Sequence, residues 1–308
     1  MLALVDYINR FKSAKQKTQT FKDVEAGKVD VLIGTHGIVS KKIKAFLREY
    51  QPTAHWHVDE LKAYDTFFSL TRHFKVNPNR FFANFLEDSK IVASDYFPYW
   101  NSIKLHYQQK RETYIRQVGF SDMLSFYHIC KHIPAEYQVQ LANSSTVRYM
   151  QLFDLNPKVK VFCNRGTSGI DGSTSTAVGA SIYQKEPILL ITGDLSFLYD
   201  SNGLWNDYIR PDFKIILINN GGGGIFRILP GRENSENFER YFETVQHRDV
   251  SHLCKMFGFE HFVVENEKSL EKTLPVFFQQ KTGPSLLEVD TPRILNDKIL
   301  LGYFDFIS

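Results

Sequence analysis

Residues 191–224 decide the fold, and they read ITGDLSFLYDSNGLWNDYIRPDFKIILINNGGGG. Two apolar runs, PILLITGD (187–194) and FKIILINN (213–220), lack polar alternation and are typical of strands covered by helices on both faces. The first run ends at Asp194, and the second ends at Asn220 before four glycines. Two strands therefore bring a carboxylate, a pair of amides and a bare backbone to one edge of a sheet.

Outward from this stretch, predicted helices alternate with predicted strands from about Phe120 onward. This alternation predicts an α/β fold with an open, mostly parallel sheet flanked by helices. The expected helices begin at Ser121 (to His132) and Ser144 and cover 171–184, 248–257 and 267–280, and the other expected strands are YQVQLANS (137–144), VKVFCNRG (159–166), FVVEN (262–266) and SLLEVD (285–290).

Polar side chains gather where four of these strands end. They are Asn143-Ser144, Asn164-Arg165-Gly166, Gly193-Asp194 and Asn219-Asn220. Ligands of open parallel sheets bind beyond the carboxyl ends of the strands. We therefore expect the functional site at this edge.

Asp194 and Asn220 are candidate metal ligands. They offer one anionic and one neutral oxygen, and a carbonyl of the glycine run would add a third, a set that suits Mg²⁺ holding a phosphate. The helix expected to begin near Ser196 would supply free N–H groups to the same phosphate. Two simpler interpretations stay open, a helix cap for Asp194 and a turn for Asn220.

Gly221–Gly224 does not match the known phosphate-binding glycine motifs. The run lacks the spacing G-x-G-x-x-G, and the chain contains no G-x-x-x-x-G-K-[ST]. A Rossmann or ATPase site is therefore disfavoured. The glycines would let the backbone approach a cofactor closely, or they form a flexible loop without a ligand.

Composition narrows the class of protein. Of 308 residues, 43% are hydrophobic and 23% charged, and the formal net charge is +3, too small to indicate a nucleic-acid partner. No window resembles a membrane span, and Asp6 interrupts any signal-peptide core. The three widely spaced cysteines, 130, 163 and 254, indicate buried thiols in a reducing cytoplasm.

Five ordered motifs from residue 41 to 308 resemble thiamine-diphosphate enzymes, in particular the carboligases of the menaquinone pathway. They are AHWHVDE (54–60), NSSTVR (143–148), NRGTSGIDGSTSTAVG (164–179), TGDLSFLYDSNGLW (192–205) and INNGGGGIFRILP (218–230). The resemblance implies thiamine diphosphate and Mg²⁺, or Mn²⁺, as cofactors. It also implies a homo-oligomer.

The resemblance assigns roles to single residues. Asp194, Asn220 and the carbonyl of Gly222 would hold the metal, and Gly193, Leu195 and Ser196 would adjoin the diphosphate. Ile170 would lie beside the reactive rings of the cofactor. Ser144, Arg148 and Arg165 would bind substrate carboxylates, and Phe226 and Leu229 would form an apolar wall. The simpler interpretations are a surface or ion-paired side chain for Arg165 and core positions for Phe226 and Leu229.

The implied reaction decarboxylates 2-oxoglutarate and adds the remaining unit to isochorismate. The family places a glutamate that activates the cofactor in an N-terminal pyrimidine-binding domain, for which the chain shows no counterpart. We therefore expect the isolated chain not to turn over, and a non-catalytic fragment that binds cofactor or a partner is the alternative.

The first residues resemble a different family. INRFKSAKQKTQTFKDVEAGKVDVLIGTH (8–36) is similar to a helicase segment of the transcription-repair coupling factor, without its phosphate loop. The predicted domains are a fused fragment at 1–36, a remnant of a central domain and connector at 37–110, and a diphosphate-binding domain at 111–308. A diverged central domain and a nucleic-acid motor are the alternatives, and the near-neutral charge disfavours the motor.

Overall fold

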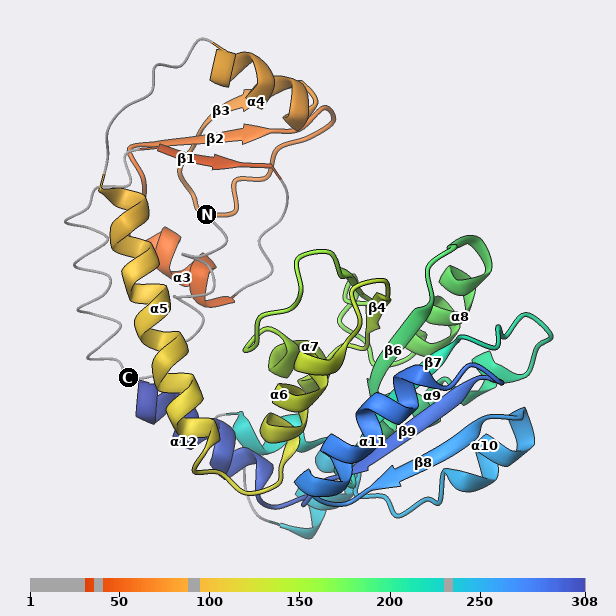
Figure 1. Cartoon of the computed structure of the whole chain (residues 1–308). Helices are drawn as coiled ribbons and strands as arrows, with labels where there is room; N and C mark the ends of the chain where they lie inside the picture. Colours follow the sequence, from red (N-terminus) through yellow and green to blue (C-terminus); the bar gives the residue numbers. More distant parts are fainter. Residues whose placement is uncertain (1–30, 36–40, 88–94, 230–234, 308) are drawn as a thin grey trace. The chain divides into compact units, whose positions relative to one another are not determined.

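The computed structural model describes residues 31–35, 41–87, 95–229 and 235–307 (Figure 1). They form two compact units, residues 1–113 with 303–308 and residues 114–302. Residues 1–30 and 36–40 lie outside the described ranges. The expected fusion at 1–36 and the boundaries at 37 and 110 therefore stay predictions.

The first unit contains a parallel three-stranded sheet in the order β1-β2-β3, and its helices are α3, α4 and most of α5. Ile43, Phe46, Leu47 and Phe67 form its small buried core. The bounds are β1 Val31–Gly34, α3 Lys41–Glu49, β2 Ala54–Val58, β3 Leu70–Phe74, α4 Pro78–Glu87 and α5 Tyr96–Ile115.

Residues 65–110 contain β3, α4 and most of α5, elements that the predicted central-domain remnant and connector at 37–110 did not specify. Aromatic residues of this segment fall at helical spacing. Phe81 and Phe85, four residues apart on α4, stack with ring centroids 5.8 Å apart. A dense aromatic run concealed this periodicity.

The second unit contains a six-stranded sheet in which each neighbouring pair of strands is parallel, in the order β5-β4-β6-β7-β9-β8. The predicted parallel α/β fold is confirmed. The bounds are β4 Gln138–Leu141, β5 Lys160–Cys163, β6 Ile188–Gly193, β7 Lys214–Asn219, β8 Glu260–Val264 and β9 Ser285–Asp290.

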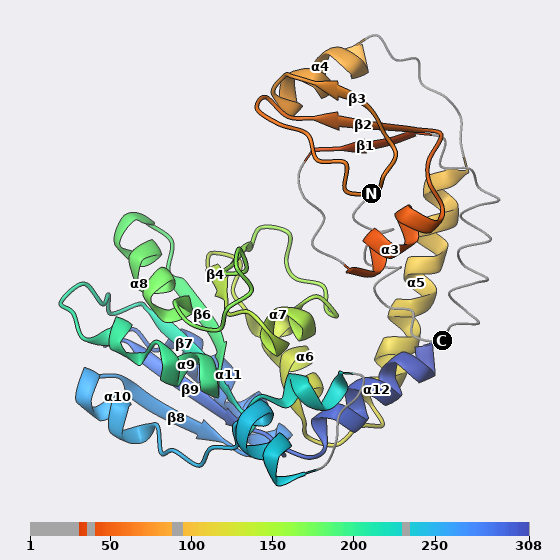
Figure 2. The same cartoon turned by 180° about the vertical axis from the view of Figure 1, so that it is seen from behind.

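Helices cover both faces of this sheet, as the opposite views of Figures 1 and 2 show. Helices α8, α9 and α10 contribute to one buried cluster together with alternate residues of β6 and β7, among them Ile188, Leu190, Ile215 and Leu217. The bounds are α6 Asp122–His132, α7 Ser145–Met150, α8 Ser173–Tyr183, α9 Asp194–Tyr199, α10 Ser251–Phe257, α11 Glu267–Gln279 and α12 Asn296–Ile307, the last of which crosses the boundary between the units.

The strand order has a switch point between β4 and β6. From β4 the chain proceeds outward to β5, and it then returns to the other side of β4 to form β6 and β7. Loops diverge at such a point and leave a crevice at the carboxyl edge of the sheet. The four predicted polar strand ends belong to the adjacent strands β5, β4, β6 and β7.

Among the described residues, no helix is long and apolar enough to cross a membrane.

Candidate functional site

Asp194 is a buried carboxylate at the first position of α9, directly after β6. Its Oδ1 accepts a hydrogen bond from the Leu195 N–H at 2.8 Å, and its Oδ2 accepts one from Gln246 Nε2 at 2.7 Å. Burial raises the pKa of the Asp194 carboxyl to about 6, against the opposing effect of these N–H donors and that of Gly222. No salt bridge to Asp194 occurs among the described residues. The side chain is therefore held by dipoles while its charge is uncompensated.

The helix that contains Asp194 begins earlier than predicted. We expected its start near Ser196, whereas α9 begins at Asp194, so that Gly193 is the N-cap and Asp194 is the first helical residue. The residues Gly-Asp-Leu at the start of α9 show no helical periodicity, so the first turn could not be predicted from the sequence. Leu195 and Ser196 consequently lie within the first turn, where backbone N–H groups are free of helical partners.

Asn220 follows β7 and is oriented by a second buried carboxylate. Its Nδ2 donates to Asp122 Oδ2 at 2.8 Å, across 98 residues of sequence. Asp122 is the first residue of α6 and is 2% exposed. Because Asp122 takes the amide nitrogen, the amide oxygen of Asn220 stays available for another partner.

The conformation of Gly221–Gly224 is constrained by the backbone of residues 243–246, which packs beside it. Gly222 has φ 145°, and a Cβ at this position would lie 2.8 Å from the Glu243 carbonyl oxygen. The Gly223 N–H donates to that oxygen, and Gln246 N donates to the Gly221 oxygen at 3.2 Å. The close backbone approach is therefore to residues 243–246 of the same chain, which fixes where the Gly222 carbonyl lies.

Glu243 ends the π-helix Phe238–Glu243 and is fully buried between two arginines. Its Oε2 lies 2.5 Å from Arg227 Nη2 and 2.7 Å from Arg293 Nη1. The side-chain hydrogen bond from Arg227 to Glu243 raises the pKa of Arg227. This ion pair joins the segment after the glycine run to the loop after β9.

Gln246 connects Asp194 to a second chain of polar contacts. Its Nε2 also donates to Asn219 Oδ1 at 3.2 Å, and its Oε1 accepts from Arg248 N at 2.7 Å. Asn219 Nδ2 in turn donates to Glu288 Oε1 at 2.6 Å. Asp194, directly after β6, and Asn219, the last residue of β7, are thus each held by a side chain from elsewhere in the chain.

These residues fit a hard divalent cation. A carboxylate, an amide oxygen and a backbone carbonyl from Asp194, Asn220 and Gly222 are oxygen donors of the type that Mg²⁺ prefers, and they are too few to close a calcium cage. The uncompensated burial of Asp194 is the observation of this structure that favours a cation. The first turn of α9 adds N–H groups without a partner inside the helix, of which that of Leu195 already donates to Asp194, for an anion bound to that cation.

Two arginines lie at the adjoining strand ends. Arg148 is on α7 after β4, and Arg165 follows β5. Although the Arg148 side chain is solvent-accessible, partial burial and the neighbouring charge of Arg165 lower its pKa. No salt bridge to either guanidinium occurs in the described part of the chain. Two like charges brought together without a carboxylate indicate an anion-binding surface.

Ser144 is the N-cap of α7 and has φ 72°, a conformation uncommon outside glycine. Its side chain makes no capping hydrogen bond, and its carbonyl accepts from Arg148 Nη1 at 2.6 Å. Ser144 and Arg148, both expected to bind substrate carboxylates, are therefore in contact through the backbone of Ser144. Backbone strain of this kind is frequent at functional sites.

The loop after β5 is tied to α9. Ser196 Oγ donates to the Ile170 carbonyl at 2.5 Å, and Asn143 Nδ2 donates to the Gly169 carbonyl at 3.0 Å. Phe226 packs edge-on against Phe242 at 6.1 Å, whereas Leu229 is 48% exposed. A plain core position for Leu229, the simpler alternative, is therefore wrong.

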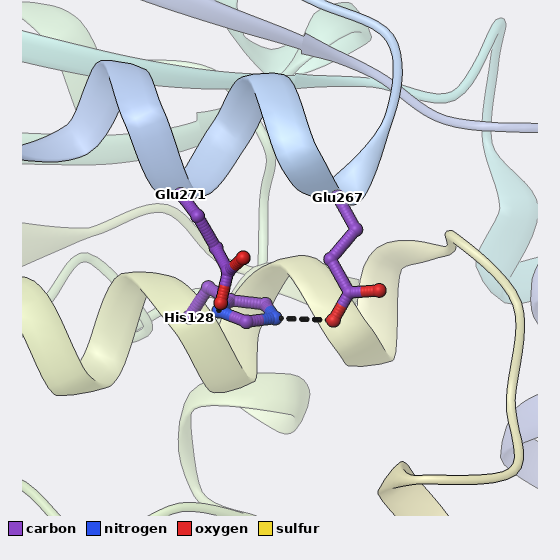
Figure 3. A group of neighbouring side chains, drawn as sticks. All are labelled: His128, Glu267 and Glu271. Carbon is purple, nitrogen blue, oxygen red and sulfur yellow. Dashed lines mark hydrogen bonds and ion pairs between the residues drawn. The ribbon is translucent and has the colours of Figure 1, made fainter.

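Another cluster lies outside this edge and joins α6 to α11 (Figure 3). His128 Nε2 is 2.9 Å from Glu267 Oε1, and His128 Nδ1 is 3.4 Å from Glu271 Oε1. The three donor atoms lie within 4.8 Å, a spacing compatible with a cation. Each ring nitrogen, however, faces its own carboxylate, and Glu267 occupies the favourable first turn of α11. The cluster therefore links α6 to α11 through two histidine–carboxylate pairs.

Comparison with known proteins identifies the type of domain. Residues 143–289 match the family model described as thiamine pyrophosphate enzyme, C-terminal TPP binding domain. Residues 143–289 belong to the thiamine-diphosphate enzyme family. Both Asp194 and Asn220, together with the arginines at 148 and 165, lie inside the matched range.

Three relatives of this chain share one name. It is 50% identical over 285 residues to the 2-succinyl-5-enolpyruvyl-6-hydroxy-3-cyclohexene-1-carboxylate synthase of Flavobacterium johnsoniae, covering 92% of this chain and 51% of the relative. It is 52% identical to that of Flavobacterium psychrophilum (89% and 50% covered) and 38% identical to that of Porphyromonas gingivalis (91% and 50% covered). The chain therefore spans about half the length of the curated relatives it matches, and the predicted kinship is confirmed.

Sequence reasoning did not identify Asp122, Glu243 or Gln246. Asp122 looked like an ordinary first-turn acid after the cap Ser121, which does accept from Leu124 N at 3.4 Å. Glu243 and Gln246 belong to a segment without strand or helix periodicity. No local signal predicts their contacts with residues 16 to 98 positions away.

Proposed function

We propose that the chain binds Mg²⁺ and thiamine diphosphate at the carboxyl edge of the six-stranded sheet. Asp194, Asn220 and the carbonyl of Gly222 hold the metal, and the first turn of α9 receives the diphosphate. The observation that carries this proposal is the buried carboxylate of Asp194, to which no described side chain forms a salt bridge. Mn²⁺ would replace Mg²⁺ because both accept hard oxygen ligands.

The proposed activity is that of a carboligase. The bound cofactor supplies an electron sink for decarboxylation of a 2-oxo acid. Around it, Asn143 and Ser196 fix the loop that carries Ile170, which we place beside the cofactor rings. The exposed Leu229 and the half-buried Phe226 would form an apolar wall of the site.

The proposed substrates are 2-oxoglutarate and isochorismate, which each carry two carboxylates. The guanidiniums of Arg148 and Arg165, without a salt bridge in the described ranges, support this class of substrate, because arginine binds carboxylates in bidentate form. Ser144 would donate its hydroxyl to the same carboxylates. The names of the relatives favour this reaction over other thiamine-dependent ones. We also propose that the protein is a homo-oligomer and that it is located in the cytoplasm. The three free cysteines are compatible with such a reducing compartment.

The decisive experiment is calorimetric titration of the purified chain with thiamine diphosphate, with Mg²⁺ and with EDTA. We expect saturable binding that is at least tenfold tighter with Mg²⁺. Equal heats under both conditions would contradict the metal role. An assay with 2-oxoglutarate and isochorismate then tests the expectation that the isolated chain binds the cofactor without turnover.

A further inference from the structure

The position of Asn220 does not by itself determine which way its side-chain amide points. A side-chain amide has an oxygen on one arm and an NH₂ group on the other, and the two have nearly the same shape. Only the oxygen ligates a cation, whereas the NH₂ group would repel it. A metal site that uses asparagine therefore needs a neighbour that distinguishes the two arms.

Asp122 is in the position to do so. Its Oδ2 lies 2.8 Å from Asn220 Nδ2, and its Oδ1 accepts from Thr291 Oγ1 at 2.6 Å. Both oxygens of Asp122 accept hydrogen bonds, and these bonds favour its ionised form, which cannot donate, although burial raises the pKa of the carboxyl. If the Asn220 amide turned over, two oxygens would face each other in a buried place. The contact therefore permits one orientation of the amide.

Asp122 is itself fixed from three sides. Its backbone N–H donates to Asn296 Oδ1 at 2.7 Å, and Asn296 Nδ2 reaches Thr291 Oγ1 at 3.4 Å. All three residues are buried, with Asp122 2%, Thr291 4% and Asn296 6% exposed. Because α6 begins at Asp122, the helix start and the orienting carboxylate are the same residue.

We propose that Asp122 is a positioning residue that turns the oxygen of Asn220 toward the metal. It acts through Asn220 and touches neither metal nor cofactor. This role rests on the proposed function, in which Asn220 is a metal ligand. Partners of this kind that orient a metal ligand change metal affinity by about 10- to 100-fold when they are removed.

The test uses two variants and Mn²⁺, whose binding in the presence of thiamine diphosphate is followed by electron paramagnetic resonance. Asp122→Leu removes the acceptor at similar volume, and Mn²⁺ affinity should fall at least tenfold. Asp122→Leu combined with Asn220→Asp should return affinity to within about threefold of wild type. A carboxylate carries oxygen on both arms, so it needs no orientation.

Recovery of Mn²⁺ affinity in the double variant would distinguish a positioning role of Asp122 from a purely structural one. If Asp122 only stabilised α6, a change at Asn220 would restore nothing. Asp200→Leu is the matched control, because Asp200 is also buried and its two oxygens accept from the Ser175 N–H and Oγ at 2.7 and 2.6 Å. This control should lose stability while keeping Mn²⁺ affinity within about threefold.

Three outcomes would overturn the inference. They are unchanged affinity in Asp122→Leu, no recovery in the double variant, or a loss in Asp200→Leu as large as in Asp122→Leu. If the leucine variants do not fold, the exchange Asp122→Asn with Asn220→Asp replaces them. It reverses donor and acceptor, should bind Mn²⁺ within about threefold of wild type, and overturns the inference if it does not bind.

A second readout requires no cofactor. In the wild type, the side-chain NH₂ signals of Asn220 in a ¹H–¹⁵N spectrum should exchange slowly with water, because Asp122 accepts from them. In Asp122→Leu they should exchange at least tenfold faster. Wild-type protein that shows slow NH₂ exchange but binds no Mn²⁺ would contradict the proposed metal site and leave the orientation by Asp122 intact. Fast exchange in the wild type would contradict the orientation itself.

Discussion

Each edge of the six-stranded sheet contains a buried charged group, Lys214 at the amino edge and Asp194 at the carboxyl edge, and the surroundings of these two charges differ. At the amino edge, Lys214 Nζ donates to the Gln280 carbonyl at 2.9 Å and to Ser285 Oγ at 3.0 Å, and it lies 4.8 Å from the Phe277 ring centroid. At the carboxyl edge, Asp194 accepts only from N–H groups within the described residues. The ammonium has partners for its protons inside the fold, whereas no described cationic side chain pairs with the carboxylate.

The direction of the pKa shifts reflects this difference. Burial lowers the pKa of Lys214 to about 8, although Glu260 and Asp212 oppose it, and burial raises the pKa of Asp194 to about 6. Both charged forms are therefore disfavoured by the fold alone. Lys214 lies near the opposite charges of Glu260 and Asp212, which offset part of this cost, whereas the charge near Asp194 is the like charge of Asp122. Asp194 would therefore need an external cation, which is how a binding edge differs from a structural edge.

Replacing Asp194 should have the largest effect. We expect Asp194→Asn to weaken Mg²⁺-dependent binding of thiamine diphosphate more than 100-fold, because the anionic ligand is lost. Without metal, the variant should be more stable than wild type at pH 7 by about 1 kcal/mol, because a neutral amide is buried at less cost. Calorimetry and urea unfolding measure the two effects.

The same residue gives a pH dependence with a definite sign. Since the pKa of Asp194 is raised in the fold, the folded chain binds a proton that the unfolded chain does not between about pH 4 and pH 6. Its contribution therefore increases the stability of the metal-free chain as pH falls through this window. Asp194→Asn should lack this contribution, and identical pH profiles of the two proteins would contradict it.

The next largest effect should come from the backbone of the carboxyl edge. We expect Gly222→Ala to lower the free energy of unfolding by about 3 kcal/mol, because φ is 145° and the new Cβ would lie 2.8 Å from the Glu243 oxygen. Gly224→Ala is the control, since its Cβ would meet Asn220 Nδ2 at an ordinary 3.6 Å. Equal losses in both variants would contradict the role of the contact.

Changes at the amino edge should affect stability and leave binding alone. We expect Lys214→Met to cost about 2 kcal/mol at pH 7, because the Gln280 and Ser285 oxygens lose a donor. Affinity for Mg²⁺ and thiamine diphosphate should stay within twofold of wild type. A tenfold loss of affinity would remove the distinction between the edges.

Lys214 should also give the wild type a rise in stability at alkaline pH. Between about pH 8 and pH 10.5 the unfolded lysine binds a proton that the folded one does not, so stability increases with pH by about 2 kcal/mol from this group. Lys214→Met should lack the rise. Urea unfolding at pH 7.5 and pH 9.5 makes the comparison, and parallel changes in both proteins would contradict it.

The smallest effect is expected along β5, which carries one cation at each end. Arg165→Ala should weaken binding of glutarate, a dicarboxylate without a reactive keto group, about tenfold in the Mg²⁺- and cofactor-loaded chain. Lys160→Ala, at the amino end, removes only an exposed pair with Glu186 and should leave glutarate affinity unchanged. Similar losses in both would indicate a general charge effect in place of a site.

The sequence was sufficient for features that depend on local pattern. Unbroken apolar runs such as 213–220 predicted buried parallel strands, and parallel strands bring their ends to one edge. The pattern of the chain alone therefore placed Ser144, Arg165, Asp194 and Asn220 at a common edge, and Arg148 was added by the family resemblance. The start of α9 was placed too late, and β3 and α4 were not predicted, because short helix starts and aromatic runs obscure periodicity.

The contacts that orient these residues could not be predicted. Asp122 meets Asn220, Gln246 meets Asp194, and Glu243 meets Arg227 and Arg293 only because the sheet brings distant segments together. Such pairings follow from tertiary packing and leave no spacing signal. The sequence therefore indicated which groups are present at the site, and the structure added how each is aimed.

Gly222 adds a consequence that concerns handedness. At φ 145° the backbone occupies a region that suits residues of the opposite chirality, and the side on which an L-residue would place its Cβ is taken by the Glu243 oxygen. Among the genetically encoded residues, only the achiral one meets both conditions. A chain assembled by chemical ligation with D-alanine at 222 should keep this conformation, whereas one with L-alanine should not.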